Sequence, residues 1–482
     1  MAPEVAKFLN PPLCANSQRT VDDKLLPCEN EAPFVCSGCQ FVQYCSTECQ
    51  QSDRKHHKVN CKSAFMTGTW VPAWLKDKRK PAFVDAPDTK IKTYGPQNDR
   101  QLSRHQHCFQ AAHNGGTDRI VNQVLNLLFA ASGDIGNIVK TVRRLPKEYQ
   151  GNCTMVCNDN DFQVNGRNVI LLMTVLHFEP EVSTPIMIHL WMFNPEQVDI
   201  RDRNTLAFDP AQRETLVNFR RTGVLLPFGC STKEFTVPNP WPLGWMVNPL
   251  HGWDEPDYMK HAQVAKADHY GALFFFLRST LQEFCVLIRN MNIKFRVYNR
   301  DASTLPQVEK LQFDRIEISS LCDESYWGPE TAIRTFGPML KSKHENPSAT
   351  LLFLFLSSAV NEMEKLDFEG QMHAFPLSRK KILWELLSVT PGKLNSLEKH
   401  EPQSVAMAQC SVMLFNFDRL FQPMHRRVIR SALENGLRIK NKHTIVKPWP
   451  WSIFDSSTKD EFNMMRRHSR SGAERYMELQ LA

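Results

Sequence analysis

The 482-residue sequence lacks the long, unbroken apolar segment from which a membrane-spanning helix is predicted. Its longest apolar run is 349–360 (ATLLFLFLSSAV), whereas a span needs about 20 residues, so we expect this run to be a buried strand. The N-terminal residues, Met1 to Asn10, have no cationic start followed by an apolar run, and no signal peptide is predicted. We therefore expect an intracellular protein, in the cytoplasm or the nucleus, with no membrane partner.

The sequence also lacks a dominant sign of charge. It has 58 Lys and Arg against 51 Asp and Glu, a net charge of +7, which is a mild excess and not the basic signature of a nucleic-acid-binding protein. One basic stretch, 425–442, lies on helix-like sequence. We interpret it as a solvated helix face, with a surface for nucleic acid or an acidic partner as the alternative.

Motifs for common enzyme chemistry are missing as well. The sequence contains no G-x-S-x-G elbow, no G-x-x-x-x-G-K-[ST] loop and no H-E-x-x-H pair. The signatures of SET-domain lysine methyltransferases are not visible either. We therefore predict no catalytic residue and lean toward a protein that is not an enzyme.

What the sequence does have is a concentration of cysteine, because half of its 14 cysteines precede residue 62. Two thiolates of a Cys-x-x-Cys pair can approach one tetrahedral zinc ion, and pairs spaced by three intervening residues lie on one face of a helix. Each such pair is half of a site, and the segment therefore offers eight ligands for two zinc ions. In chain order these ligands are Cys14, Cys28, Cys36, Cys39, Cys45, Cys49, His57 and Cys61.

Two alternatives to this assignment were weighed. A disulfide framework needs an oxidising compartment, and cytosolic chains with this spacing are more often zinc sites. His56 competes with His57 as the histidine ligand. The His-x-x-x-Cys spacing to Cys61 favours His57 and leaves His56 as a solvated neighbour.

The stretch 36–61 (CSGCQFVQYCSTECQQSDRKHHKVNC) resembles the MYND-type zinc finger. The resemblance implies a cross-brace in which the two sites interleave along the chain. Cys14 and Cys28 are separated by more than the usual Cys-x-x-Cys spacing of the family, and Arg54 replaces a tryptophan that often follows Asp53. The implied sets are Cys14, Cys28, Cys45 and Cys49 on one zinc, and Cys36, Cys39, His57 and Cys61 on the other.

Four protein ligands close each tetrahedron, so these sites are structural and leave no position for a catalytic water. Zinc then supplies most of the folding free energy of the finger, on the order of 10 kcal/mol per site. Between Cys14 and Cys61 the acidic residues slightly outnumber the basic ones, and we do not expect a nucleic-acid partner. MYND fingers bind short proline-containing peptides, and the resemblance implies protein partners of this kind.

Beyond the finger, strands and helices alternate. The apolar run 125–130 leads into a turn with Gly133 and Gly136, a helix over 138–145, a strand over 154–157 ending in Asn158-Asp159-Asn160-Asp161, and a helix over 162–178. Later strands are predicted over 294–298, 313–318 and 349–356, with a helix over 329–340. This order predicts a parallel sheet in a Rossmann-like α/β domain and looks like the S-adenosylmethionine methyltransferase fold.

A second resemblance concerns residues 122–189. The sequences 129–137 (FAASGDIGN), 158–161 (NDND) and 166–172 (GRNVILL) are similar to a domain of unknown function. That domain stands at the N-terminus of an axonemal dynein assembly factor and follows MYND fingers in many fungal proteins. The resemblance names a family and implies no activity.

The glycine turn raises the question of a cofactor. Gly133, Asp134 and Asp159 or Asp161 stand where a Rossmann-like domain holds a nucleotide. The alternative is structural: Gly133 and Gly136 reverse the chain, and Asp134 caps the next helix. We assign no cofactor-binding residue and expect a degenerate scaffold. A methyltransferase that uses S-adenosylmethionine, with the finger selecting its substrate, is the competing hypothesis.

The sequence thus predicts four regions in order. These are the finger at 14–61, a proline-rich linker at 62–98, the α/β domain at 99–378 and a mostly helical C-terminal extension at 379–482 whose last residues are frayed. The function that fits them is a zinc-binding adaptor that docks peptides.

Overall fold

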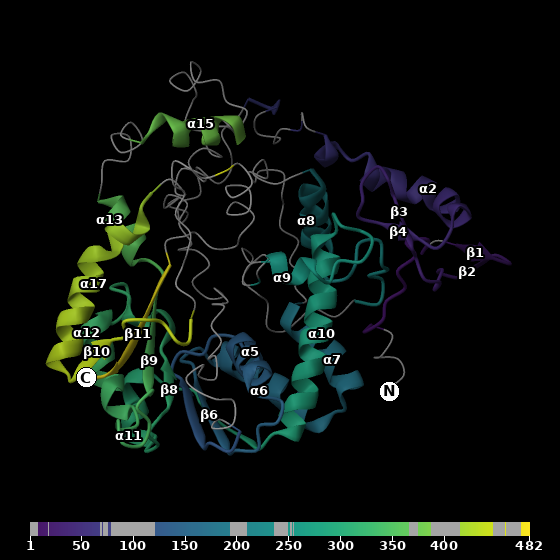
Figure 1. The fold of residues 1–482 in the computed structure, drawn as a ribbon. Helices are drawn as coiled ribbons and strands as arrows, with labels where there is room; N and C mark the ends of the chain where they lie inside the picture. The colour runs from purple at the N-terminus through teal and green to yellow at the C-terminus, as the bar shows by residue number, and fades with distance from the viewer. Residues whose placement is uncertain are drawn as a thin grey trace. The chain divides into compact units, whose positions relative to one another are not determined.

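The computed structural model describes residues 8–17, 19–67, 70, 76–78, 121–192, 210–235, 249–250, 253, 255–365, 375–386, 415–446, 458 and 474–482. The chain forms two compact units, coloured along the sequence in Figure 1. We call Met1–Tyr94, Phe178–Gln282 and Trp384–Gln409 the finger unit, and Gly95–His177, Glu283–Leu383 and Cys410–Ala482 the sheet unit. Each unit is therefore built from three separate stretches of the chain.

A seven-stranded mixed sheet organises the sheet unit, in the order β10-β11-β9-β8-β5-β6-β7. Strands β5 to β9 run parallel, whereas β11 is antiparallel to both of its neighbours. The strands are β5 (Leu125–Phe129), β6 (Cys153–Asn158), β7 (Ile293–Tyr298), β8 (Arg315–Glu317), β9 (Thr350–Phe355), β10 (Leu437–Ile439) and β11 (Arg475–Leu481). All six residues of β9 are buried, as expected of a central strand covered on both faces.

Helices α12, α13 and α17 share one apolar core with the sheet, through residues that include Phe353, Phe355, Phe421 and Val428. Phe355 packs on Phe421 with ring centroids 5.0 Å apart. The helices of this unit are α5 (Gly136–Arg144), α6 (Phe162–His177), α11 (Leu305–Val308), α12 (Gly328–Phe336), α13 (Ser358–Glu364) and α17 (Phe417–Glu434); α15 (Leu377–Leu386) crosses the boundary between the units.

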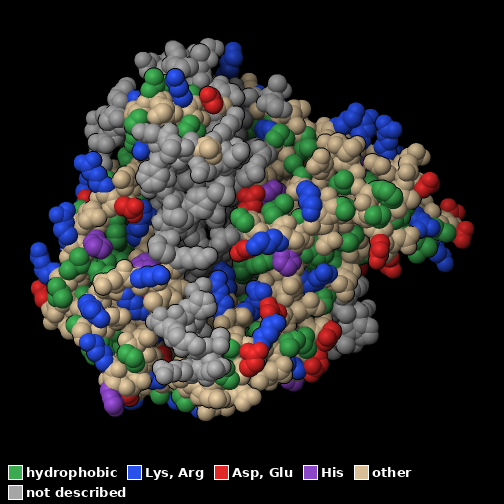
Figure 2. Space-filling model, viewed as in Figure 1, with side chains coloured by type: hydrophobic (Ala, Val, Ile, Leu, Met, Phe, Trp, Pro, Cys, Tyr) green, Lys and Arg blue, Asp and Glu red, His purple; other side chains and the backbone are tan. Residues whose placement is uncertain are grey.

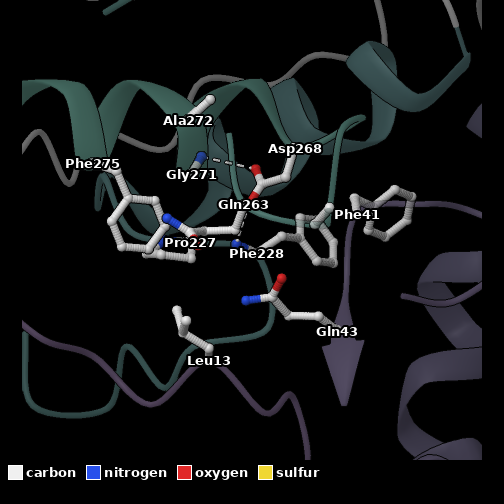
Figure 3. A pocket seen from close by; sticks show the side chains of 11 residues that line it. Leu13, Phe41, Gln43, Pro227, Phe228, Gln263, Asp268, Gly271, Ala272 and Phe275 are labelled. Atoms are coloured by element: carbon white, nitrogen blue, oxygen red, sulfur yellow. Dashed lines mark hydrogen bonds between the residues drawn. The ribbon is translucent and has the colours of Figure 1, made fainter. Parts of the chain in front are cut away.

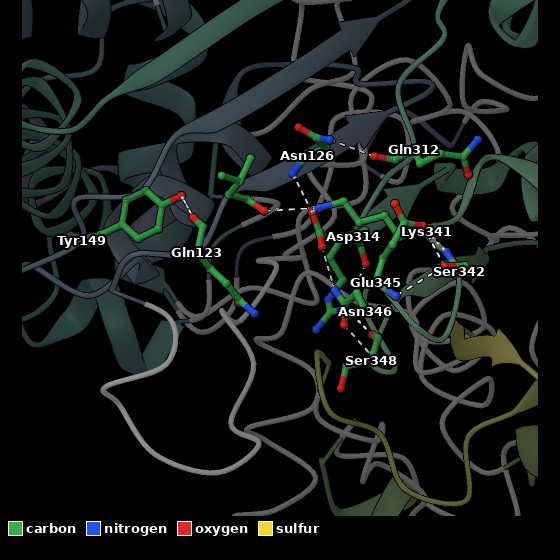
Figure 4. Close-up of polar contacts among 12 residues, drawn as sticks. Gln123, Asn126, Tyr149, Gln312, Asp314, Lys341, Ser342, Glu345, Asn346 and Ser348 are labelled. Carbon is green, nitrogen blue, oxygen red and sulfur yellow. Dashed lines mark hydrogen bonds and ion pairs between the residues drawn. The ribbon is translucent and has the colours of Figure 1, made fainter.

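One buried carboxylate joins strands at the amino-terminal edge of the sheet (Figure 4). Asp314, just before β8, accepts hydrogen bonds from the backbone N–H of Asn126 in β5 and from the side chain of Asn346, each 2.7 Å long. Lys341 pairs with the same carboxylate at 2.7 Å and also donates to the carbonyl of Val124. These contacts fix the β5–β8 register at the edge opposite the carboxyl ends of the strands.

The finger unit combines short strands with helices. Its elements are β1 (Thr20–Val21), β2 (Lys24–Leu25), β3 (Phe34–Val35), β4 (Gln43–Tyr44), α2 (Thr47–Cys61), α7 (Pro180–Met192), α8 (Pro210–Thr222), α9 (Glu255–Met259) and α10 (His269–Asn290). The boundary between the units falls within α10, after Gln282. Strands β1 and β2 form one antiparallel pair, and β3 and β4 form another.

Helix α10 is long and apolar enough, by length and composition alone, to cross a membrane. Two thirds of its most apolar window, 67%, is buried inside the protein, as in a core helix. The sequence prediction rested on unbroken apolar runs and did not identify this segment, because polar and charged residues interrupt it.

The predicted strands and helices of the α/β region are confirmed, within a few residues at their ends. Two expectations about the chain's organisation are wrong. Residues 178–282 belong with the finger, not with the sheet. The expected frayed end of the C-terminal segment is wrong, because Arg475–Leu481 form the largely buried β11, which pairs with β9. Most of the predicted linker at 62–98 lies outside the described residues.

Candidate zinc centres

The first predicted ligand set comes together at one point of the finger. The sulfur atoms of Cys14, Cys28, Cys45 and Cys49 all lie within 4.8 Å of one another. Cys14 is brought beside β4 by a bridge to Gln43, and the N–H of Cys28 donates to the carbonyl of Asn16 at 3.1 Å. Despite the long interval between them, Cys14 and Cys28 therefore meet at the same place.

The second set is equally close. The ligand atoms of Cys36, Cys39, His57 and Cys61 lie within 4.8 Å of one another, and His57 Nε2 is 3.2 Å from Cys36 Sγ and 3.5 Å from Cys39 Sγ. Cys36 and Cys39 lie on a turn that also contains Gly38, where an added Cβ would stand 3.1 Å from Cys61 Sγ. The turn can approach the end of α2 because residue 38 has no side chain.

Helix α2 carries one pair of ligands at each end. Its N-cap, Ser46, accepts a hydrogen bond from the N–H of Cys49, which fixes the first turn. His57 and Cys61 lie one turn apart at the other end. Because the helix is rigid over this length, it holds one half of each site at a fixed separation, which produces the interleaved arrangement.

The histidine ligand is His57. Its ring is buried and its Nε2 faces the thiols, whereas the side chain of His56 is 55% exposed. Burial lowers the pKa of His57, so the neutral imidazole, which is the form that binds a metal, predominates at neutral pH. Beneath the helix, the hydroxyl of Tyr44 donates to Asp53 at 2.8 Å.

The donor set fits zinc. Three or four thiols with no more than one imidazole per site match a closed tetrahedral zinc centre, and no ligand position remains open for a substrate or a reactive water. Without a metal ion, burial raises the pKa of Cys14 to about 12 and also raises the pKa of Cys39. A divalent cation stabilises the thiolates and so offsets the free-energy cost of ionising buried thiols. Metal binding therefore releases protons.

The finger does not stand apart from the rest of its unit (Figure 3). Phe41 and Phe228 pack with ring centroids 4.3 Å apart, and Phe228 belongs to the same apolar cluster as the buried ligands. The N–H of Ala267 donates to the carbonyl of Gln40 at 3.1 Å. The space left between these elements is only about 10 Å³, too little for a ligand.

At this contact, Gly229 lies close to Ala15 of the finger. Its φ is +90°, and an added Cβ would lie 3.0 Å from the Cβ of Ala15 in the finger. Asp268, fully buried at the start of α10, accepts from the N–H groups of Phe228 and Gly271 at 2.7 and 2.9 Å. Burial raises its pKa to about 6. No local signal in the sequence identifies residues 227–230 as the partner of the finger.

The residues proposed for a nucleotide site line a separate cavity of about 530 Å³ in the sheet unit. It lies at the carboxyl ends of β5, β6, β7 and β8. Asp159 accepts from the N–H groups of Gly133 and Asp161, each at 2.9 Å, and Asp134 accepts from the N–H of Gly136 at 2.8 Å. This arrangement fits the structural alternative, since Asp134 binds the first residue of α5.

Comparison with known families places two domains on the chain. The model of the MYND finger matches residues 14–61, and that of a domain of unknown function (DUF4470) matches residues 98–193. No curated protein and no solved structure matches the chain. Together with the geometry, the first match shows a finger whose two sites, Cys14/Cys28/Cys45/Cys49 and Cys36/Cys39/His57/Cys61, fit two zinc ions.

Proposed function

We propose that this chain is an intracellular adaptor whose MYND finger docks short proline-containing peptides of other proteins and whose sheet unit is a scaffold. The observation that carries the proposal is the pair of closed four-ligand sites. A centre without an open position stabilises a fold, and the fold is then available for recognition. MYND fingers are protein-interaction modules, which supports protein partners for this one.

The surface of the finger supports the same conclusion. Phe34 on β3 is 59% exposed, and Leu26 and Val59 are exposed as well, whereas Phe41 and Phe228 cover each other. Exposed apolar side chains, one of them aromatic, can contact the rings of a proline-containing peptide. Acidic and basic side chains lie together at the β1–β2 end of the finger in Figure 2. Asp22, Asp23 and Lys24, in the β1–β2 hairpin, are exposed. Mixed charge favours a peptide over a nucleic acid.

Peptide binding to the full zinc-loaded chain tests this proposal. A library of short peptides with and without proline should yield binders only among those with proline. Phe34→Ser should weaken capture by about tenfold or more, while zinc content stays at two ions per chain. Leu433→Ser, an equally exposed apolar residue on α17, serves as the matched control and should change nothing.

A Cys36→Ser/Cys39→Ser variant alone would not settle the question. Because the finger packs on residues 227–230, loss of zinc should disturb more than the peptide site. Binding that survives in the Phe34→Ser variant and in the zinc-free variant would contradict the proposal.

We also propose that the sheet is Rossmann-like, of the methyltransferase type. The strands read 3-2-1-4-5-7-6 when those of this sheet are numbered along the chain, and the first five follow the Rossmann order. An experimental structure that places β11 parallel to β9 would contradict this. The link to an axonemal dynein assembly factor and to fungal proteins stays a prediction. The comparisons do not support a methyltransferase activity.

A further inference from the structure

A second cavity of the sheet unit lies beside the edge strand β10. Its volume is about 170 Å³, below the roughly 300–1,000 Å³ of sites that enclose a drug-sized ligand. It shares no described lining residue with the cavity at the carboxyl ends of β5 to β8. The residues that line it include Ser348, Arg438, Lys440, Asn441 and Lys442. The space suits one small group and not an extended molecule.

The cavity is lined by the last three cations of the basic stretch in the sequence, Arg438, Lys440 and Lys442. They lie beyond the end of helix α17 and are not part of its solvated face. Arg438 lies opposite Gln480 of β11, and the N–H of Lys440 donates to the carbonyl of Glu478 at 2.8 Å. Because residues two apart in an extended strand share a face, Arg438 and Lys440 lie on the same side of the sheet. The pairing of β10 with β11 thus gathers positive charge at one place.

The positive charge of this cavity is only partly balanced. Lys440 is 8% exposed, and its ammonium donates to Glu478 Oε2 at 3.1 Å and to the hydroxyl of Thr444 at 2.6 Å. A lysine ammonium has three N–H groups, so one remains for a ligand. Lys442 is exposed and has no acidic partner within the described part of the chain. Since no carboxylate is among the described lining residues, the cavity carries an excess of positive charge.

Buried Arg315, on β8, adds a further positive charge next to the cavity. Its Nη1 donates to the carbonyl of Asp314 at 2.9 Å and to the carbonyl of Ser348, a lining residue. The carboxylate of Asp314 is already paired with Lys341. Burial lowers the pKa of Lys440, and the charge of Arg315 lowers it further. An anion in the cavity would offset this repulsion between cations.

From this combination we propose that the cavity binds a phosphate group, either free phosphate or the monoester of a small molecule. Arg438, Lys440 and Lys442 supply positive charge, and Ser348 and Asn441 offer neutral hydrogen-bond donors. A phosphate carries more negative charge than a carboxylate and matches the excess of cations better. The site is separate from the zinc centres, and the proposal does not depend on peptide docking by the finger.

Calorimetric titration of the full chain tests it. The ligands are inorganic phosphate, glycerol 3-phosphate as a small monoester, and acetate as a carboxylate of similar size. We expect at least one of the two phosphates to bind with a Kd below about 1 mM, and acetate to bind at least about tenfold more weakly. The tighter of the two phosphates identifies the free ion or the monoester as the ligand. Absence of binding by both phosphates, or equal binding of acetate, would overturn the proposal.

Variants connect the binding to this cavity. Lys442→Gln should weaken phosphate binding about tenfold, through the loss of a charged hydrogen bond. It should leave the melting temperature without phosphate unchanged, because Lys442 takes no part in the contacts of Glu478. Lys294→Gln is the matched control, since Lys294 is exposed on β7, the opposite edge strand. Phosphate should raise the melting temperature of the control more than that of Lys442→Gln. Equal affinities for the two variants would place the ligand elsewhere and overturn the proposal.

Discussion

Phe41 in the zinc finger packs against Phe228, a residue far along the chain, with ring centroids 4.3 Å apart and ring planes at 60°. The two rings join the buried zinc ligands in a single apolar cluster. The finger therefore shares its core with the segment 227–230. Zinc binding, which stabilises the finger, should also stabilise that segment, and the first prediction follows from this coupling.

Removal of zinc should loosen the chain beyond the finger itself. On addition of a strong chelator, we expect amide hydrogen exchange to rise in residues 14–61 and also in 223–230, because the Phe41–Phe228 contact and the Gly229 approach depend on the folded finger. Strand β9, in the sheet unit, is the internal control and should exchange as before. Unchanged protection of 223–230 would show that the finger is energetically independent.

Truncating Phe228 should destabilise the finger unit. Phe228→Ala removes a buried ring from the shared cluster, and losses of about 3–5 kcal/mol in the free energy of unfolding are typical of such changes. Phe162→Ala is the control: its ring is 76% exposed on α6, and the change should stay within about 0.5 kcal/mol. Chemical denaturation with zinc present measures both variants.

Two glycine-to-alanine changes should have opposite effects. Gly229→Ala places a Cβ 3.0 Å from the Cβ of Ala15 at a φ of +90°. We expect the free energy of unfolding to fall by more than about 1 kcal/mol. Gly166→Ala lies within helix α6, where an added Cβ meets nothing within 4 Å. This change should raise the free energy of unfolding by about 0.5–1 kcal/mol. Thermal melting compares them. A neutral Gly229→Ala would mean that the finger is not held against residue 229.

Metal content should report on Cys14 directly. The wild type should carry two zinc ions per chain, and Cys14→Ser should lose or weaken only the site shared with Cys28, Cys45 and Cys49. Cys153→Ser is the matched control, because Cys153 lies on β6 in the sheet unit and belongs to neither cluster. Elemental analysis after dialysis gives the stoichiometry. One zinc in the wild type would contradict the two-site arrangement.

Glu317 should make the sheet unit less stable as the pH rises. Complete burial raises its pKa from 4.5 to about 8, so the folded protein keeps a proton that the unfolded chain releases above the lower value. The contribution of Glu317 to the free energy of unfolding is therefore fully present below pH 4.5. It is lost progressively as the pH rises to about 8. Glu317→Gln should flatten this dependence and stabilise the protein at pH 8, by an amount on the order of 3 kcal/mol. Denaturation midpoints across this pH range measure it, and a parallel pH profile in the variant would contradict the assignment.

The zinc sites were predictable because their signal is local. Cys36 and Cys39 share a turn, and Cys45/Cys49 and His57/Cys61 lie at opposite ends of one helix, so spacing alone defines each half-site. Which two half-sites combine into one zinc site depends on the tertiary structure. The pairing was predicted only from the resemblance to MYND fingers. The same resemblance brought Cys14 and Cys28 to one site, although nothing in their spacing requires it.

The strands β5, β6, β7 and β9 were also visible in the sequence, since runs such as Leu125–Phe129 and Thr350–Phe355 are apolar enough to be buried. Strand β10 was not visible, because it has only three residues. Strand β11 was not visible either, because its buried Glu478 is of a residue type typical of exposed positions. Glu478 is tolerated because Lys440, Thr444 and the N–H groups of 444–446 surround its carboxylate. Partners of this kind come together only in the folded chain.

The sequence by itself therefore determined the zinc chemistry and the alternation of strands and helices, because both depend on residues close together in the chain. The tertiary structure decided the rest. It placed Phe228 and Gly229 against the finger, turned the carboxylate of Asp159 toward the N–H of Gly133, and surrounded Glu478 with donors. Each of these depends on contacts between distant segments, whose free energy appears in no local pattern.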